Sequence, residues 1–284
     1  MGFFDFLSKA PLVSGFFEKP IIPVLRFSGI LSDSERRGAL SYERYRKAIH
    51  KSFELPNLKC VVLTINCPGG SPAQSEMISN LIRERAKEKD IPVYAFIEDL
   101  AASGGYWLAC SADRIFATRT SLTGSIGVIS AGFGLDEFIN KHGIKRRLYT
   151  QGKEKSLLDP FLPEKQSDVK RIGQIQKEIH QDFIQWVKNR RSDALSAEDK
   201  DIFEGQIWTS AKAKDLGIID DIGSCDMVLK EKFGDDHIRV DIPVEKKLFA
   251  LPFARTQSKT DFGPVATEII EILEEKSLWA RYGF

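Results

Sequence analysis

Two apolar segments, each followed by a glycine-containing loop and then by a helical pattern, constrain the fold of this chain most. The runs at 58–65 and 92–97 are continuous and of strand length, as in strands that are buried on both faces. After the first run, residues 72–89 carry apolar side chains at helical spacing with charged residues between them. This alternation of strand, loop and helix predicts a layered α/β fold. The second strand is expected to end at the carboxylates Glu98 and Asp99.

The rest of the chain shows a similar succession of strand and helix patterns. A short strand is expected on either side of the Thr123-Gly124-Ser125 turn, and the longest helical pattern comes later in the chain. Further strands are predicted at 20–27, 114–117, 127–129 and 145–150, and further helices at 41–53, 133–141, 168–190, 210–216 and 267–276.

One α/β domain with an extension at each end is the expected organisation. We place the domain at 20–250, an apolar or amphipathic extension at 1–19, and a second extension with a short helix at 251–284. The first extension is rich in phenylalanine, but charged residues and a proline interrupt it before the roughly 20 apolar residues of a membrane span accumulate. A signal peptide is not evident either. The phenylalanines of the 1–19 extension could contact a membrane surface or a neighbouring subunit, and the sequence favours neither.

The charge and the cysteines narrow the classes of function. The chain has 41 Lys and Arg against 40 Asp and Glu, without the basic surplus of a nucleic-acid-binding protein. Its four cysteines lack paired or metal-type spacing and are expected to be reduced thiols of a reducing compartment: Cys60, Cys67, Cys110 and Cys225. We therefore expect a cytoplasmic protein, or one that lies peripherally on the inner face of the membrane, without bound nucleic acid.

Ser103 is the candidate nucleophile. It follows a predicted strand, precedes a predicted helix, and has alanines before it and Gly104-Gly105 after it, so a substrate backbone can approach its hydroxyl. The loop at Pro68-Gly69-Gly70 follows the neighbouring strand, so the N–H groups of Gly70 and Gly104 are positioned to serve as an oxyanion hole. The same residue types also occur in a tight strand-to-helix turn, and in a phosphate loop, although the lysine and GxGxxG signatures of nucleotide loops are absent.

A serine nucleophile needs a base, and the residues alone leave the base open. The chain has four histidines, at 50, 142, 180 and 237, and none has a position that predicts contact with Ser103. A lysine can act as the base where burial lowers the pKa of its amine enough to leave it neutral. Lys153 and Lys155 both follow a predicted strand, next to Gly152, and also fit an ordinary solvated loop.

Five segments together resemble the S49 family of serine peptidases, in particular the short-form signal peptide peptidase A and SohB-like group, within the ClpP/crotonase superfamily. They follow one another in the family's order across most of residues 20–235. The segments are Asn66-Cys67-Pro68-Gly69-Gly70, Ala101-Ala102-Ser103-Gly104-Gly105-Tyr106, Leu122-Thr123-Gly124-Ser125-Ile126-Gly127, Gly152-Lys153-Glu154-Lys155-Ser156 and Gly205-Gln206-Ile207-Trp208-Thr209.

The resemblance implies a ClpP/crotonase-like fold of repeated β-β-α units, with layered sheets flanked by helices, and a metal-independent endopeptidase with no cofactor. It implies that Ser103 attacks peptides or extended polypeptides, including signal-peptide remnants or membrane-protein fragments. Lys155 takes the role of base, the hydroxyl of Ser125 orients the lysine, and Gly70 and Gly104 form the oxyanion hole. It also implies a homo-oligomer with sites near the subunit interfaces.

Two departures from the family and two rival functions accompany this interpretation. Cys67 replaces the serine of the family's Asn-Ser-Pro-Gly-Gly segment, and relatives commonly carry an N-terminal membrane anchor or signal that is not evident here. A crotonase-type CoA enzyme would use the same N–H groups on a thioester enolate and would not need the hydroxyl of Ser103. A non-catalytic assembly protein of the same fold would need neither Ser103 nor Lys155.

Overall fold

The computed structural model describes residues 19–34, 38–152, 154–196, 198–244 and 276–283. The chain divides into two compact units: the first comprises 1–126 and 186–284, and the second comprises 127–185. In chain order, the elements are β1 (Ile21–Ser28), α3 (Tyr42–Ser52), β2 (Val61–Cys67), α4 (Pro72–Lys89), β3 (Val93–Ala102), α5 (Gly104–Ala109), β4 (Arg114–Ala117), β5 (Leu122–Gly124), α6 (Asp136–Lys141), α7 (Gln166–Arg191), α8 (Asp199–Ile202), β6 (Ile207–Thr209), α9 (Ser210–Asp215), β7 (Asp221–Ile222), α10 (Cys225–Phe233) and β8 (Ile238–Asp241).

A single mixed sheet forms the centre of the first unit. Its main path runs β6-β5-β3-β2-β1-β8, and β4 pairs with β3 and with β7. All of these pairings are parallel except that of β5 with β6. The apolar runs predicted as buried strands are β2 and β3, which lie beside each other near the middle of the sheet.

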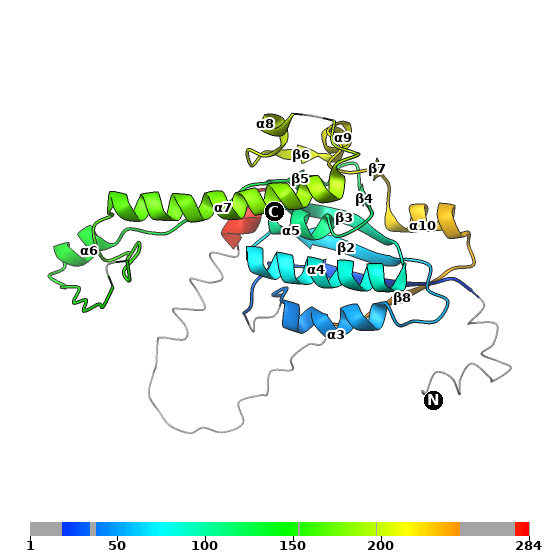
Figure 1. The fold of residues 1–284 in the computed structure, drawn as a ribbon, viewed down its shortest axis with the longest axis horizontal. Helices are drawn as coiled ribbons and strands as arrows, with labels where there is room; N and C mark the ends of the chain where they lie inside the picture. The colour runs from blue at the N-terminus through cyan, green and yellow to red at the C-terminus, as the bar shows by residue number, and fades with distance from the viewer. Residues whose placement is uncertain (1–18, 35–37, 153, 197, 245–275, 284) are drawn as a thin grey trace, which may run out of the picture. The chain divides into compact units, whose positions relative to one another are not determined.

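Helices cover both faces of this sheet. In Figure 1, α3, α4 and α5 lie across one face. On that face the ring of Tyr45 from α3 stacks on Phe27 of β1, with 4.5 Å between the ring centroids. On the other face, Val228 and Leu229 of α10 join the core cluster formed by side chains of β1, β2, β3 and β4. Alternate residues of the inner strands therefore meet apolar partners on both sides, which explains their continuous apolar character.

The helix α4 has the bounds that its sequence predicts. Ser71 precedes it, and its hydroxyl accepts a hydrogen bond from the N–H of Gln74 at 3.4 Å; Pro72 then occupies the first helical position. Asp90 ends the helix in the left-handed conformation, with φ at 53°, and its N–H bonds to carbonyls of the last turn. These local end signals are the reason that the prediction was accurate for this helix.

Strand β3 does not end at the two carboxylates, as the sequence suggested, but continues to Ala102. Pairing with β5 extends it, because Leu100, Ala101 and Ala102 have register partners there. Both carboxylates also have partners: Glu98 pairs with Arg26 at 2.8 Å, and Asp99 accepts a hydrogen bond from Asn66 at 2.6 Å. These tertiary contacts thus allow the backbone to stay extended at Glu98 and Asp99, although both residues are charged.

Two other strand predictions are wrong. Residues 127–129 and 145–150 form no strand, and the strand of that region is Leu122–Gly124, which includes Thr123 and Gly124 of the predicted turn. Every strand of the described residues belongs to the first unit, so 145–150, in the second unit, has no ladder partner. The predicted helix at 267–276 lies outside the described residues except for Lys276, which is helical.

The fold is α/β, as predicted. The longest helix of the described residues, α7, extends over residues 166–191, close to the predicted range of 168–190. All four cysteines are free thiols, as predicted, and all but Cys225 are buried. None of the helices in the described residues is long and apolar enough to cross a membrane. The predicted division of the chain at residues 19 and 250 remains a prediction.

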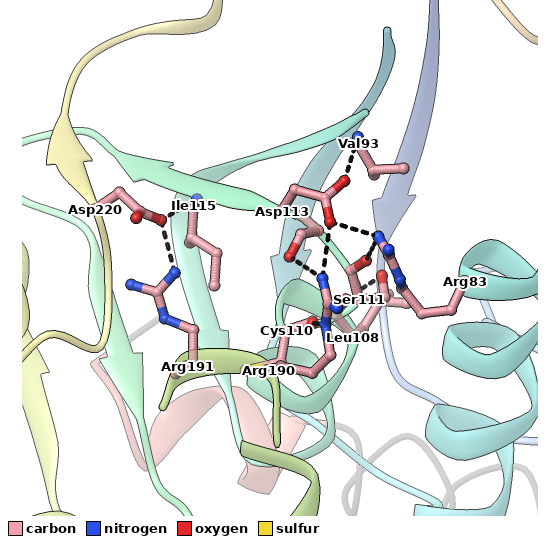
Figure 2. A network of polar contacts seen from close by, with 11 residues as sticks. Arg83, Val93, Leu108, Cys110, Ser111, Asp113, Ile115, Arg190, Arg191 and Asp220 are labelled. Carbon is pink, nitrogen blue, oxygen red and sulfur yellow. Dashed lines mark hydrogen bonds and ion pairs between the residues drawn. The ribbon is translucent and has the colours of Figure 1, made fainter. Parts of the chain in front are cut away.

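A buried ion pair ties α7 to the sheet and gives a test of the fold. Arg191 and Asp220 approach to 2.7 Å (Figure 2), with side chains only 3% and 14% exposed. Arg191 also donates to the carbonyl of Gly217 at 2.9 Å. Arg191→Ala leaves the Asp220 carboxylate with only Arg114, at 3.3 Å, as an ionic partner among the described residues. We therefore expect the free energy of unfolding to fall by about 3 kcal/mol in urea titrations, the lower end of the range for a broken buried pair.

The exposed pair of Arg239 and Asp226 provides the matched control. These side chains are 40% and 84% exposed, so Arg239→Ala should change the free energy of unfolding by about 1 kcal/mol or less. Equal losses in the two variants would contradict a special contribution from the buried pair.

Candidate active site

Ser103 lies at a sharp junction between β3 and α5. Its backbone has φ 51° and ψ −122°, a conformation that residues other than glycine rarely adopt. Its N–H donates to the carbonyl of Gly124 at 2.9 Å, and its carbonyl accepts from Tyr106 and Trp107 at 2.9 and 3.0 Å. These bonds hold a backbone whose strain is of the order of 1–3 kcal/mol.

The hydroxyl of Ser103 makes no capping hydrogen bond to α5, although the residue occupies the N-cap position. The helix that follows is buried along its whole length, whereas Ser103 itself is partly exposed. A strained, partly exposed serine between a strand and a buried helix, with a hydroxyl not used for capping, is the arrangement of an accessible nucleophile.

The glycine loop after β2 packs directly against this junction. A Cβ atom placed on Gly69 would lie 2.9 Å from the Cβ of Ser103 and 3.2 Å from the nitrogen of Gly104. A Cβ on Gly70, whose φ is 131°, would lie 2.2 Å from the carbonyl oxygen of Leu31. Glycine is therefore required by space as well as by conformation, and the two loops meet as their order in the sequence predicted.

The backbone of Leu31 holds this loop in place on its other side. The N–H of Leu31 donates to the carbonyl of Gly69 at 2.9 Å, and its carbonyl accepts from Ser71 at 2.7 Å. Between these two bonds, the N–H of Gly70 is not a donor in any of the described loop and turn hydrogen bonds, and neither is that of Gly104. Both N–H groups are thus available to donate hydrogen bonds to an anion. The N–H of Gly104 lies in the first turn of α5, where N–H groups have no partner within the helix.

Ser125 lies next to Ser103 because of strand register. Ala102 of β3 is the register partner of Gly124 in β5, so the residues that follow, Ser103 and Ser125, emerge at the same edge of the sheet. Ser125 also has a positive φ of 53°, and its N–H donates to the carbonyl of Gln206 at 2.6 Å. The structure therefore brings together Ser103, Ser125, Gly70 and Gly104, four of the five site residues predicted from the sequence.

Cys67 supports the loop without offering a competing nucleophile. Its Sγ accepts a hydrogen bond from the N–H of Gly69 at 3.4 Å. Burial raises the pKa of its thiol to about 12, so the sulfur stays protonated near neutral pH. The replacement of the family's serine by Cys67 leaves a side chain that still bonds the turn.

The C-terminal end of α5 is fastened by side chains from α7. Trp186 donates its indole N–H to the carbonyl of Trp107 at 3.0 Å. Arg190, which Figure 2 shows beside Cys110, donates to the carbonyls of Cys110 and Ala112, each at 3.0 Å. Cationic donors at the carbonyl end of a helix also interact favourably with its dipole. The short helix α5 is therefore fixed at its C-terminal end by α7 and at its N-terminal end by the hydrogen bonds of Ser103.

A carboxylate shared between two arginines completes this anchor. Asp113 accepts from Arg190 at 2.9 Å and from Arg83 of α4 at 2.8 Å, and it accepts the N–H of Val93 at the start of β3 (Figure 2). Arg83 also donates to the carbonyl of Ser111. The sequence did not reveal this network, because its members come from four separate segments and none has a motif.

Lys155, the fifth predicted residue, belongs to the second unit. It is exposed, in a turn where its N–H donates to the carbonyl of Gly152 at 3.3 Å, and Gly152 has a positive φ of 98°. Lys153 lies outside the described residues. The assignment of the base to Lys155 stays a prediction.

A search of the described residues finds no group of three or more histidine, cysteine, aspartate or glutamate side chains that could hold a metal ion. The site is built from hydroxyls, backbone N–H groups and glycines, which is a set suited to acyl transfer.

The family model for peptidase family S49 matches residues 85–237, which is more than half of the chain. The chain belongs to peptidase family S49. The matched residues include Ser103, Gly104, Ser125 and Lys155, whereas Gly70 precedes them.

Curated relatives match more of the chain than the family model does. A Brucella abortus protein named Na(+)/H(+) antiporter NhaA is 38% identical over 92% of this chain, but the chain spans only 37% of its length. Protease 4 of Salmonella typhi is 30% identical over 80% of this chain, which spans 36% of that protein. The chain thus spans little more than a third of the length of these relatives.

A solved structure supports the S49 fold. A mutant of the 1510-N membrane-bound stomatin-specific protease superposes with a TM-score of 0.50 at 15% identity, over 80% of this chain and 99% of that one. At this identity the likeness concerns the fold alone, and it confirms the predicted ClpP-like class.

The contacts at Gly70 give a prediction for this site. Gly70→Ala places a methyl group against the backbone of Leu31 at a positive φ, so either the loop or the residue 31 segment must move. We expect the free energy of unfolding to fall by about 1–3 kcal/mol in chemical denaturation.

Gly132→Ala is the control, since a Cβ there would meet nothing within 4 Å. It should change the free energy of unfolding by about 0.5 kcal/mol or less. A Gly70→Ala variant as stable as Gly132→Ala would show that the loop is not packed as described.

Proposed function

We propose that this chain is a serine endopeptidase that cleaves peptides or unfolded and extended polypeptides through a Ser-Lys dyad. The single observation that carries the proposal is Ser103 at its strained junction, with the glycine loop of residues 69–70 packed against it. Membership of family S49 supports hydrolysis of peptide bonds as the reaction.

The reaction assigns one task to each group. The Oγ of Ser103 attacks the peptide carbonyl and passes its proton to the neutral amine of Lys155, and the N–H groups of Gly70 and Gly104 stabilise the oxyanion. The C–N bond then breaks as the ammonium gives its proton to the departing amine. Water attacks the resulting ester of Ser103, and the carboxylic acid leaves. The hydroxyl of Ser125 orients Lys155 throughout.

Two histidines of the first unit are poor alternatives as the base. His237 bonds the carbonyl of Gly234 at 2.7 Å and precedes β8, which lies at the opposite end of the sheet from β5. His50 is in the last turn of α3, where its ring nitrogen lies 3.3 Å from Arg85 near the end of α4. The C-terminal ends of α3 and α4 lead into the starts of β2 and β3, whereas Ser103 follows the end of β3. His50 therefore lies toward the opposite edge of the sheet from Ser103.

Substitution of the dyad tests the proposal. Ser103→Ala should abolish cleavage of an unfolded protein such as casein, because the attacking hydroxyl is removed. Lys155→Ala and Lys155→Arg should both lower the rate at least about 100-fold, the usual contribution of a general base, since arginine keeps the charge but does not release a proton.

Lys153→Ala is the matched control and should retain most of the activity. Labelling of Ser103 by a fluorophosphonate provides a second readout that does not depend on the choice of substrate. Full cleavage by Lys155→Ala would refute the dyad. A protein whose Ser103 resists every such probe would instead favour a CoA-thioester enzyme or a non-catalytic assembly protein.

We further propose that the protein works as a homo-oligomer, with a second copy covering apolar side chains of the second unit. Phe133 and Tyr149 are 80% and 90% exposed in the single chain, and Ile129, Phe138 and Ile144 are also exposed. Exposed aromatic and aliphatic residues concentrated in one small unit are a feature of protein interfaces. Covering the unit that bears Lys155 would also remove water from its amine.

Replacing two of these side chains tests the assembly. Phe133→Ser with Tyr149→Ser should reduce the molar mass measured by light scattering, because each removes a large apolar area from the contact. Met227→Ser is the control: Met227 is also strongly exposed, at 70%, but it belongs to the first unit. An unchanged mass in the double variant would exclude this surface as the contact.

The location of the protein is also part of the proposal. Four free thiols fit a reducing compartment such as the cytoplasm. The N-terminal segment, which lies outside the described residues, would then provide any peripheral contact with the inner face of a membrane.

A further inference from the structure

A segment distant in sequence reaches the edge of the sheet where Ser103 lies. Residues 276–280 form a short helix, coloured red in Figure 1, and a turn follows to Gly283. The hydroxyl of Tyr282 donates a hydrogen bond to the Oγ of Ser125 at 3.2 Å. No sequence motif predicted this contact, because the two residues lie 157 positions apart and the neighbours of Tyr282 are not distinctive.

The 276–283 segment has one side turned toward the protein. Leu278, Trp279 and Tyr282 are half-buried, whereas Lys276, Ser277, Ala280, Arg281 and Gly283 are exposed. Spacing of three and four residues places the three half-buried side chains on one face of the turn that they form. One face of the segment therefore carries an aliphatic side chain and two aromatic ones that are half-buried, and the hydroxyl of the last ring makes the hydrogen bond to Ser125.

The place of contact is next to the nucleophile. Ser125 follows Gly124, and the carbonyl of Gly124 accepts the N–H of Ser103 at 2.9 Å. Ser125 itself is only partly exposed, and Tyr282, which is also half-buried, bonds its hydroxyl. A serine hydroxyl has one hydrogen to donate and two acceptor positions, and Tyr282 occupies one of the latter.

We propose that the surface around Ser125 is a binding site for the chain's own 276–283 segment, and that the bound segment keeps substrate away from Ser103. This inference rests on the proposed function, because it makes the segment a competitor of the peptide substrate. The ligand class is a short peptide with aromatic side chains, of which the last carries a hydroxyl. One neutral hydrogen bond and a few half-buried side chains make a reversible block.

Substitution of Tyr282 in the full chain is the first test. Tyr282→Ala should increase the rate of Ser103 labelling by a fluorophosphonate, and of peptide cleavage, by roughly tenfold, since it removes both the ring and the hydrogen bond. Tyr282→Phe keeps the ring and should give a smaller increase. Arg281→Ala, which changes the exposed neighbour, is the control and should leave both rates unchanged.

A second test separates blocking from an effect on folding. Removal of residues 277–284 should give the same faster labelling as Tyr282→Ala, and a synthetic peptide of that sequence, added in excess, should slow the shortened protein again. Circular dichroism verifies that each variant is folded.

The possible outcomes distinguish this inference from the proposed function. Equal or slower labelling after Tyr282→Ala, in a protein whose Ser103 still reacts, would overturn the block and leave the peptidase intact. Failure of Ser103 to react in every variant, including the shortened one, would count against the peptidase itself.

Discussion

The hydrogen bond between the N–H of Ser103 and the carbonyl of Gly124 is the contact on which the rest of the site depends. It continues the pairing of β3 with β5 by one residue beyond Ala102 and Gly124, and so holds Ser103 at a positive φ. The same pairing places Ser125 at this edge of the sheet. Without β5, Leu100 and Ala102 would have no register partner, and only Ala101, which also pairs with Cys67 of β2, would remain in a ladder beyond the two carboxylates.

Strain at the nucleophile is offset by anchors that lie at some distance from it. The glycine loop of residues 69–70 fits against Ser103 and Gly104 only because it lacks side chains, and Leu31 holds it from behind. At the other end of α5, Trp186 and Arg190 satisfy carbonyls that a short helix leaves without partners. A well-anchored scaffold around a partly exposed serine is what preorganised catalysis requires, since the donors must already be in place when charge develops.

The division into two units has a consequence for the chemistry. The nucleophile, the N–H donors and Ser125 belong to one unit, and Lys155 belongs to the other, while α7 begins in the second unit and ends in the first. In our proposal the site is complete only when a lysine from the smaller unit joins the hydroxyl of the larger one. An enzyme built in this way can be controlled through assembly, and through any segment that occupies Ser125 first.

Local patterns in the sequence were sufficient for the layered α/β class, for the bounds of α4, and for the convergence of Ser103, Gly104 and Gly70 at one edge of the sheet. These features follow from residue size, periodicity and chain order, which are properties of neighbouring residues. The extension of β3, the anchor of α5 by Arg190, and the contact of Tyr282 with Ser125 could only be seen in three dimensions. Each joins segments that are far apart in the chain, and such pairings are decided by the free energy of the whole packed fold rather than by any one stretch of residues.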